Sequence, residues 1–288
     1  MSMLRMGQDD AYKIYVEFIK IYIRVNQRNR PHKEIKMIEL LCFPYLDDNF
    51  GLIIHNRENG KTLAVDAGES ETIDRLLTQK GWHLDELLIT HHHSDHIDGV
   101  MALKEKYNPK ITAPKHEAIS FADVIVMGGE EIEAAGLSFQ VIATPGHSLD
   151  HIVFYCESEK ILAAADTLFS LGCGRMFEGT AAQFWDSLDQ LRQLPDDVTL
   201  YCGHEYTLAN ARFALHVDPD NMALQQRAKE VESLRNEGKM TLPVTLGLEK
   251  QTNPFLRVDD REIRARLDMT VASNAEVFGK LRKMKDDF

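Results

Sequence analysis

The stretch Thr90-His91-His92-His93-Ser94-Asp95-His96 decides both the fold and the chemistry open to this chain. It follows the apolar run DELLIT (residues 85–90), which predicts a buried strand. Just after a strand, alternate side chains share a face, so His91 and His93 can bind one ion together. The Asp95-His96 pair stands near the start of a predicted helix and can face a second ion. Imidazole and carboxylate groups are ligands for Zn, Fe and Mn ions.

The alternative for this stretch is a solvated polar loop. Five charged or imidazole groups within six residues, directly after an apolar strand, argue for ligands instead. A metal site also needs further ligands, and three later segments offer a histidine or an aspartate at a strand end. A lone histidine or aspartate can simply complete a hydrogen-bond network or cap a helix, but three such strand ends together predict ligands. The segments are Thr144-Pro145-Gly146-His147, Ala165-Asp166-Thr167 and Cys202-Gly203-His204-Glu205-Tyr206.

The composition is that of an ordinary globular protein, with 288 residues, 44% of them hydrophobic and 27% charged. The formal net charge of −12 argues against nucleic-acid binding, which needs a basic face. The four cysteines are sparse and form no Cys-x-x-Cys pair, so we expect a reduced, cytoplasmic setting.

The first 36 residues form an N-terminal extension of unknown role. Its run AYKIYVEFIKIYIRV (residues 11–25) is interrupted by four charged residues and is too short for a membrane span. No small-residue cleavage site follows, so we expect no cleaved signal peptide. A loosely attached strand or helix, or a non-native upstream extension, competes with a membrane-surface or partner-binding helix. The apolar residues do not settle on one helical face, which favours the former.

From Met37 onward, short apolar runs separated by turns predict a mixed α/β region up to about residue 205, followed by a mainly helical region. Glu58-Asn59-Gly60 is the expected hairpin turn between two of the first strands. The predicted strands are residues 38–46, 50–56, 61–68, 85–90, 110–113, 137–143, 151–156, 161–165 and 198–202. The predicted helices are residues 69–80, 97–107, 181–194, 209–216, 222–236, 261–267 and 274–285.

The histidine cluster resembles the THxHxDH signature of the metallo-β-lactamase superfamily. Later segments are similar to a narrower family, glyoxalase II or hydroxyacylglutathione hydrolase, and the match spans Met37 to Phe288. The segments are Asp166-Thr167-Leu168-Phe169, Gly172-Cys173-Gly174-Arg175, Phe177-Glu178-Gly179-Thr180, Gly203-His204-Glu205-Tyr206-Thr207, Asn253-Pro254-Phe255-Leu256-Arg257 and Arg282-x-x-Lys285-Asp286-x-Phe288.

The resemblance implies an α/β fold, the αββα four-layer sandwich, as a catalytic domain over residues 37–205, with a helical substrate-binding domain over residues 206–288. It implies hydrolysis of S-(2-hydroxyacyl)glutathione, chiefly S-(R)-lactoylglutathione, to glutathione and D-lactate in methylglyoxal detoxification. A bridging hydroxide on two divalent metal ions would attack the thioester. Zinc is the expected metal, with Fe or Mn as alternatives.

Matching positions carry the family's metal ligands onto this chain. His91, His93 and His147 would hold the first ion, and Asp166 would bridge the two. The second ion's ligands would be Asp95, His96 and His204. Asp95 and Asp166 would also serve catalysis, since Asp95 can accept a hydrogen bond from the hydroxide and orient it.

The implied substrate contacts are Arg175, Phe177, Tyr206, Arg282 and Lys285. Arg282 and Lys285 are three residues apart, so on a helix they share a face that can bind a glutathione carboxylate. A solvated terminal charge pair is the alternative. Phe177 stands where some members have a tyrosine, so that hydroxyl contact is missing.

Besides Phe177, Asp150 and Ala165 depart from the family pattern, and each replaces a glycine. Asp150 could alter its loop, and Ala165 places a small constraint on the backbone. Asp66 either orients a ligand histidine or forms an ordinary turn. We expect Cys173 to be a packing residue rather than a nucleophile.

Of the remaining histidines, His92 should point away from the metals and His151 should be structural. The competing functions are a single-iron persulfide dioxygenase, another metallo-β-lactamase-fold hydrolase for a lactone or β-lactam, and a catalytically silent metal-binding protein. All seven ligand positions and the glutathione-binding positions are filled, which favours the thioester hydrolase. We expect a monomer whose partner is the small-molecule thioester.

Overall fold

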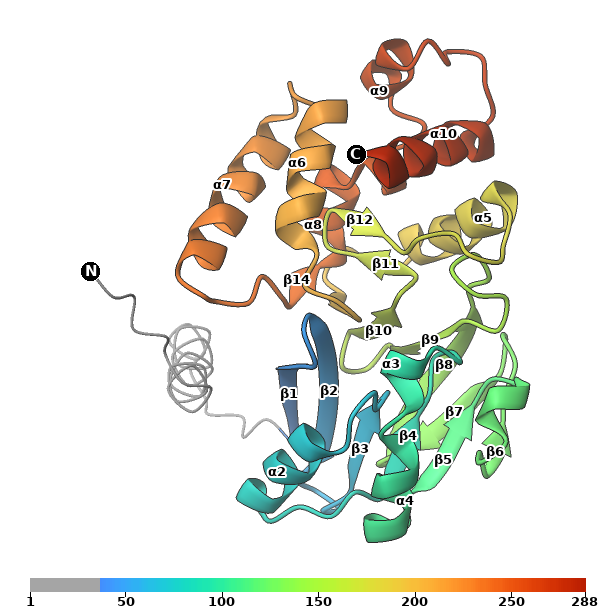
Figure 1. Cartoon of the computed structure of the whole chain (residues 1–288), viewed down its shortest axis with the longest axis vertical. Helices are drawn as coiled ribbons and strands as arrows, with labels where there is room; N and C mark the ends of the chain where they lie inside the picture. The colour runs from blue at the N-terminus through green and yellow to red at the C-terminus, as the bar shows by residue number, and fades with distance from the viewer. Residues whose placement is uncertain (1–36) are drawn as a thin grey trace.

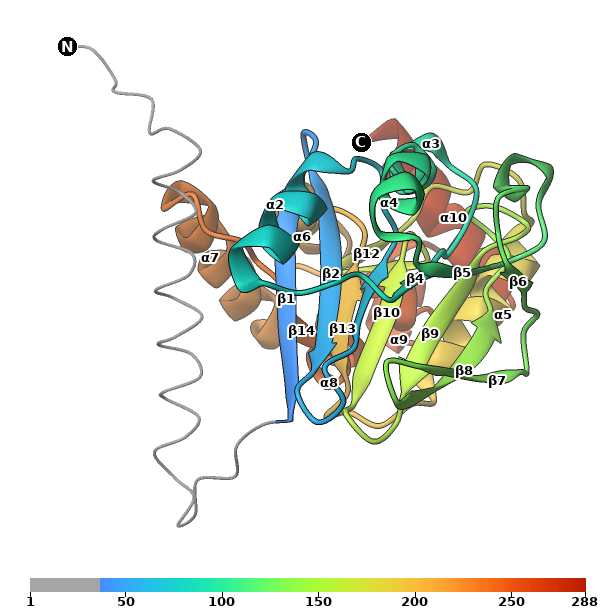
Figure 2. The same ribbon diagram turned by 90° about the horizontal axis from the view of Figure 1, so that it is seen from below.

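The computed structural model describes residues 37–288, so the N-terminal extension and its alternatives lie outside the described residues. Two six-stranded sheets pack face to face with helices against their outer faces (Figures 1 and 2). Figure 1 shows α6, α7 and α10 gathered at one end of the molecule and α2 and α4 at the other. No helix in residues 37–288 combines the length and apolar character that crossing a membrane requires.

The first sheet has the strand order β1-β2-β3-β4-β5-β6. Its first three strands are an antiparallel meander, and from β3 to β6 the neighbours are parallel. The predicted hairpin turn is confirmed between β2 and β3, where Gly60 adopts a φ of 73°. The strands are β1 (Ile38–Tyr45), β2 (Asn49–Asn56), β3 (Thr62–Val65), β4 (Glu86–Leu88), β5 (Lys110–Ala113) and β6 (Val124–Ile125).

The second sheet has the strand order β14-β13-β10-β9-β8-β7. Strands β8, β10 and β13 run in the same direction, so their carboxyl ends meet at one edge. A two-stranded β11-β12 hairpin lies outside both sheets. The strands are β7 (Glu131–Ala134), β8 (Leu137–Ala143), β9 (Ile152–Cys156), β10 (Ile161–Ala165), β11 (Leu168–Phe169), β12 (Gly172–Cys173), β13 (Thr199–Cys202) and β14 (Val244–Thr245).

The prediction of a mainly helical region after residue 205 is confirmed, and the one strand in it, β14, was not expected. This two-residue strand pairs Val244 with Leu200 at the edge of the second sheet. A segment of two residues has no detectable alternation, and its extended form depends on the neighbouring strand. Strands β6, β7, β11 and β12 were not expected either.

Strand alternation sorts the apolar side chains into separate layers. In β1, Leu41, Phe43 and Tyr45 pack with α2 and α4 on the outer face of the first sheet. Cys42 faces the other way, into the core that includes Phe139 and Phe154 of the second sheet. Successive side chains of a strand point to opposite faces, so one strand contributes to two layers. The resulting order is helix, sheet, sheet, helix, as expected from the sequence.

Most predicted helices are confirmed within a few residues. The exception is the helix expected at residues 97–107, which is interrupted because the Gly99 amide donates to the carbonyl of Ala67 in a neighbouring loop. Helix α8 was not expected. The helices are α2 (Glu71–Lys80), α3 (Ser94–Ile97), α4 (Val100–Tyr107), α5 (Ala181–Arg192), α6 (Thr207–Val217), α7 (Met222–Asn236), α8 (Leu246–Thr252), α9 (Arg261–Arg266) and α10 (Asn274–Asp287), with single 3₁₀ turns η1 (Glu117–Ile119) and η2 (Pro254–Leu256).

The buried carboxylate of Glu249 ties α8 to the β11-β12 hairpin. It accepts hydrogen bonds from the Ser170 hydroxyl at 2.9 Å, the Leu171 amide at 2.6 Å and the Asn253 side chain at 3.1 Å. Asn253 also donates to the carbonyl of Gly172 at 2.8 Å. The C-terminal segment therefore fixes the hairpin that leads into residues 173–175. The division into domains at residue 205 remains a prediction.

The core between the sheets yields a stability prediction. Phe154 is completely buried, so Phe154→Ala should lower the free energy of unfolding by about 3–5 kcal/mol through lost burial and a residual cavity. Met101→Ala is the control, since Met101 is 57% exposed and its loss should change stability by no more than roughly 0.5 kcal/mol. Denaturant unfolding measures both, and equal effects would contradict this packing.

Candidate metal centre

The predicted ligands lie at the carboxyl ends of four strands. The histidine cluster follows β4, His147 follows β8, Asp166 follows β10 and His204 follows β13. Because β8, β10 and β13 end at the same edge of their sheet, residues far apart in the sequence are brought together. Segments at strand ends can change conformation without disturbing the sheet, which suits them to carry ligands.

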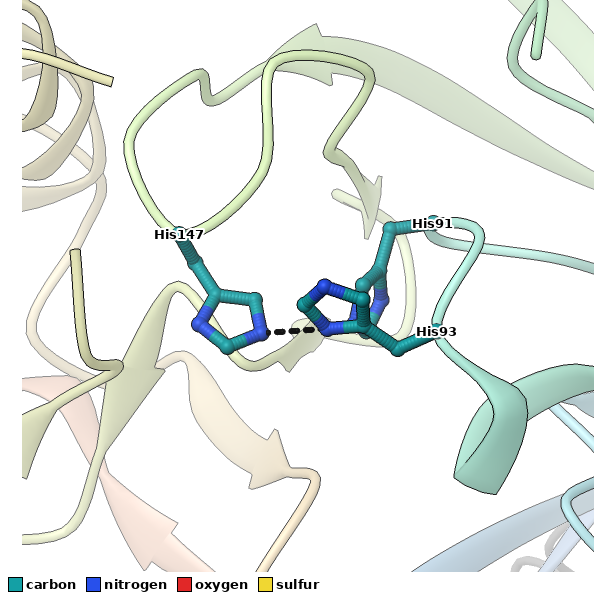
Figure 3. A group of neighbouring side chains, drawn as sticks. All are labelled: His91, His93 and His147. Atoms are coloured by element: carbon teal, nitrogen blue, oxygen red, sulfur yellow. Dashed lines mark hydrogen bonds between the residues drawn. The ribbon is translucent and has the colours of Figure 1, made fainter. Parts of the chain in front are cut away.

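Three of the predicted ligands, His91, His93 and His147, form one group (Figure 3). His93 Nδ1 lies 3.1 Å from His91 Nε2 and 2.9 Å from His147 Nε2. Two nitrogens bound tetrahedrally to zinc at their usual distance would lie about 3.3–3.4 Å apart. The three nitrogens therefore already stand close to the spacing that one ion requires. Burial lowers the pKa of all three histidines, which favours the neutral, metal-binding form.

Asp95, His96 and His204 form a second group. Asp95 Oδ2 lies 3.6 Å from His96 Nε2 and 3.4 Å from His204 Nε2. Burial alone would lower the pKa of His204, but the Asp166 carboxylate outweighs it and raises the pKa to about 10. Without a metal, this raised pKa favours the protonated form of His204, and metal binding would release that proton.

The carboxylate of Asp166 contacts both groups. Its Oδ2 lies 3.4 Å from His147 Nε2 and 3.2 Å from His204 Nε2, and its Oδ1 lies 3.5 Å from His96 Nε2. Asp166 Oδ1 and His96 Nε2 are both buried and have no hydrogen-bond partner among the described residues. Buried polar atoms are normally paired, so these two orphaned atoms fit a bound cation. The residues present therefore suit a pair of divalent ions.

Each of three ligand imidazoles has its other nitrogen held by a neighbouring oxygen. His96 Nδ1 lies 2.8 Å from Asp66 Oδ2, and His147 Nδ1 lies 2.8 Å from the carbonyl of Arg175. His204 Nδ1 lies 2.9 Å from Asp48 Oδ1. Such contacts leave Nε2 free for a metal and fix the ring's orientation. Of the two interpretations of Asp66, the structure favours contact with a ligand histidine.

The predicted substrate residues lie near this centre. Phe177 is 60% exposed, and its ring meets those of His93 and His147 edge-on at 5.8 Å and 5.3 Å between centroids. Tyr206 stacks on His204 at 4.8 Å. Arg175 is exposed, and its Nε lies 3.3 Å from the carboxylate of Asp286.

The two predicted C-terminal contacts differ in exposure. Arg282 is buried and donates to the carbonyls of Cys173 at 2.9 Å and Gly174 at 3.3 Å. Part of its guanidinium is therefore occupied by hydrogen bonds within the protein. Lys285 is half-buried, with its ammonium 5.6 Å from the Phe213 ring centre. The substrate-binding roles of all five residues remain predictions.

Comparisons with known proteins cover nearly all of the described chain. A family model described as "Metallo-beta-lactamase superfamily" matches residues 49–204, and one described as "Hydroxyacylglutathione hydrolase C-terminus" matches residues 205–288. The "Hydroxyacylglutathione hydrolase" of Rhodopseudomonas palustris is 50% identical over 252 residues, which cover 86% of this chain and 98% of that protein. The protein of the same name from Rhizobium meliloti is 49% identical over 253 residues, covering 87% and 99%.

The chain belongs to the hydroxyacylglutathione hydrolase family. Solved structures share its fold at lower identity. A crystal structure of ETHE1 from Myxococcus xanthus is 24% identical with a TM-score of 0.59, covering 85% of this chain and 96% of that one. The BLEG-1 B3 metallo-beta-lactamase is 19% identical with a TM-score of 0.57, covering 76% and 99%. Divalent metal binding through histidine and aspartate is implied by this fold.

Ala165 stands where the family pattern has glycine, and its backbone conformation is strained. Its φ is +40°, in the left-handed region that glycine adopts without strain. A non-glycine residue held there costs on the order of 1–3 kcal/mol. The strained residue directly precedes Asp166, whose carboxylate contacts histidines of both groups.

His151 and Cys173 have the structural character expected of them. His151 Nδ1 lies 3.1 Å from the hydroxyls of both Thr144 and Thr167, and its Nε2 accepts from the Asp166 amide at 3.3 Å. The ring therefore joins the loops that carry two ligands. Burial raises the pKa of Cys173 to about 11, so its thiol stays protonated at neutral pH.

Sequence reasoning missed Asp48 and Asn49. Asp48 supports His204, and the Asn49 side chain donates to Asp95 Oδ2 at 2.9 Å. Backbone hydrogen bonds join the same loop to the His204 segment, from Glu205 to Asp48 at 2.8 Å and from Phe50 to Gly203 at 2.7 Å. A signal was present, since a polar Asp-Asp-Asn run follows a predicted strand just as the ligand segments do.

The support of His204 by Asp48 can be tested. Asp48→Ala should weaken divalent metal binding about 10–100-fold, because His204 loses the group that fixes its orientation. Asp47→Ala is a matched control, since Asp47 is an exposed neighbour and its loss should leave the affinity unchanged. Titration against a metal-binding dye measures both. Equal affinities in the two variants would show that Asp48 does not support the site.

Proposed function

We propose that this chain hydrolyses S-(2-hydroxyacyl)glutathione, chiefly S-(R)-lactoylglutathione, to glutathione and D-lactate in methylglyoxal detoxification. The observation that carries the proposal is the identity of about half the residues over 98–99% of two curated hydroxyacylglutathione hydrolases. This similarity includes the C-terminal region, residues 205–288, which has its own family model. The two solved structures described above are below 25% identity and support the fold only, so neither favours an alternative activity.

We infer that His91, His93 and His147 would hold one ion. Asp166, which contacts both groups, would be shared between this ion and the second. The second ion is assigned to Asp95, His96 and His204. When bound, two divalent ions supply activation of a water molecule at neutral pH and stabilisation of negative charge on the thioester oxygen. Zinc is the metal we infer, with Fe or Mn as alternatives, since imidazole and carboxylate ligands suit all three.

The chain's own residues orient the attack. Asp95 can accept a hydrogen bond from the attacking water, because the charges around it favour its ionised form. Burial raises the pKa of Asp95, but the hydrogen bond from His204 and the charge of His96 more than reverse this and lower the pKa well below its ordinary value. Asn49 holds Asp95 Oδ2 in place. The thiolate of glutathione is a good leaving group and needs little protonation.

A basic cluster beside the centre would bind the glutathione tail. Arg175 and Arg282 are linked to His147 through the backbone of residues 173–175, and Lys285 lies three residues after Arg282 on α10. Arg282 contacts the carbonyls of Cys173 and Gly174, and His147 contacts that of Arg175. Glutathione has two carboxylates, and such a patch lets an acidic protein attract an anionic substrate. Phe177 and Tyr206 would contribute apolar contact nearby.

We further infer a cytoplasmic, monomeric enzyme. All four cysteines fall within residues 37–288, and each is free and buried. Absence of disulfides among them supports a reducing compartment.

Thiol release is the direct test of the proposed activity. The purified chain should hydrolyse S-D-lactoylglutathione with release of one thiol per thioester, and Asp166→Ala should lower both the rate and the metal content, because Asp166 contacts both ligand groups. A dye that reacts with thiols follows the rate, and mass spectrometry counts the metals. A protein loaded with two ions that releases no thiol would exclude this substrate. An unchanged metal content in Asp166→Ala would exclude the bridging role.

Substrate binding by Lys285 is tested separately. Lys285→Ala should raise KM severalfold while kcat changes little, because a carboxylate contact remote from the reacting carbonyl contributes to binding only. Lys283→Ala is the matched control: it lies on the same helix, is exposed and pairs with Asp287, so it should change neither constant. A fall in kcat at constant KM would assign Lys285 another role.

A further inference from the structure

A second cluster of potential ligands lies beside the proposed centre and uses none of its seven residues. His92 lies in the loop after β4, His116 in the loop after β5, and Asp150 in the loop after β8. One ligand atom from each lies within 4.8 Å of the others. Three separate loops thus direct metal-binding groups to one place.

The contacts within this cluster are close. Asp150 Oδ1 lies 2.8 Å from His92 Nδ1 and accepts the Ser148 hydroxyl at 2.7 Å. The rings of His92 and His116 stack, with centroids 3.8 Å apart and an interplanar angle of 13°. His116 Nδ1 accepts the Ala118 amide at 3.2 Å, which leaves the opposite nitrogen, Nε2, for another partner.

Asp150 provides an independent indication of a ligand. Its side chain is only 5% exposed. Oδ2 is buried and has no hydrogen-bond partner among residues 37–288. An unpaired, buried carboxylate oxygen is strongly unfavourable unless a cation or donor reaches it. The orphaned oxygen and the adjacent imidazoles together match the ligand chemistry of a transition-metal ion.

We propose that His92, His116 and Asp150 form a third metal site, selective for zinc and similar transition ions. Two imidazoles and one carboxylate are a common three-residue ligand set for zinc that leaves a fourth position open. Glu178 lies on the other side of the His92 ring, with Oε1 3.6 Å from His92 Nε2, and is not part of the proposed ligand set. Because the two imidazole rings are stacked, binding one ion with both requires the partly exposed His116 ring to rotate so that its free nitrogen faces the ion. Oxygen-preferring Mg²⁺ and Ca²⁺ suit this set poorly.

This ion would join the loop that carries His147 to the loop after β5. Glu178 already accepts the Leu149 amide at 2.7 Å, and it follows Phe177, whose ring lies against His93 and His147. The third site would therefore restrain the rim of the proposed active centre. Asp150 also distinguishes this chain from the family pattern, because the resemblance predicts a glycine at this position.

Counting zinc tests the proposal without measuring activity. The full-length chain is dialysed against buffer with micromolar free zinc, and bound zinc per chain is measured by mass spectrometry. Asp150→Asn keeps an acceptor oxygen for Ser148 but loses the charge. His116→Asn keeps a side-chain acceptor for the Ala118 amide but loses the imidazole. Each variant should bind one ion fewer than the wild type, because the zinc affinity of the third site should fall by at least about tenfold.

His83→Asn is the control for adventitious zinc binding, since His83 is exposed and lies outside both clusters. It should bind as much zinc as the wild type, and thermal unfolding should show that all variants are folded. The decisive quantity is the difference between wild type and variant, so the test does not depend on how many ions the proposed binuclear centre holds. Equal zinc in wild type, Asp150→Asn and His116→Asn would overturn the proposal and leave a simple hydrogen bond between His92 and Asp150.

Discussion

The buried carboxylate of Asp166 is the constraint on which the rest of the site depends. Burial raises its pKa, yet the charges of His96 and His204 outweigh burial and lower the pKa well below its usual range. An ionised carboxylate without solvent is stable only if positive charge surrounds it. The histidines around Asp166, and the cations they are suited to hold, meet that requirement. His147, Asp166 and His204 are placed by the three parallel strand ends of the second sheet, and His96 by the segment that follows β4 of the first sheet.

Close packing around this carboxylate explains two glycines of the sequence. A Cβ atom on Gly203 would lie 2.2 Å from Asp166 Oδ1, and one on Gly174 would lie 2.0 Å from the Asp166 carbonyl oxygen. Both distances are far inside van der Waals contact, so any other residue at either position would displace Asp166. Gly174 also precedes Arg175, whose carbonyl holds His147. The backbone that supports the ligands therefore also leads to the basic cluster.

Much of this arrangement was predictable because its signals are local. The ligand segments each follow an apolar strand, and most strands and helices are periodic enough to recognise. Asp48 and Asn49 were missed although they follow a strand, because Asp48 contacts His204, 156 residues away, and Asn49 contacts Asp95, 46 residues away. Strand β14 was missed because two residues have no period. The orphaned oxygen of Asp150 could not be predicted, since burial and lack of a partner exist only in three dimensions.

The spread of the ligands along the chain has a consequence for folding. They extend from His91 to His204 and converge only when both sheets have formed, so an unfolded chain offers no comparable site. An ion that binds only the native state shifts the folding equilibrium by mass action, in proportion to the logarithm of its free concentration. Bound metal would then add to the stability of the folded chain as well as serve the reaction. Chelation and heat would both shift the same equilibrium toward the unfolded chain.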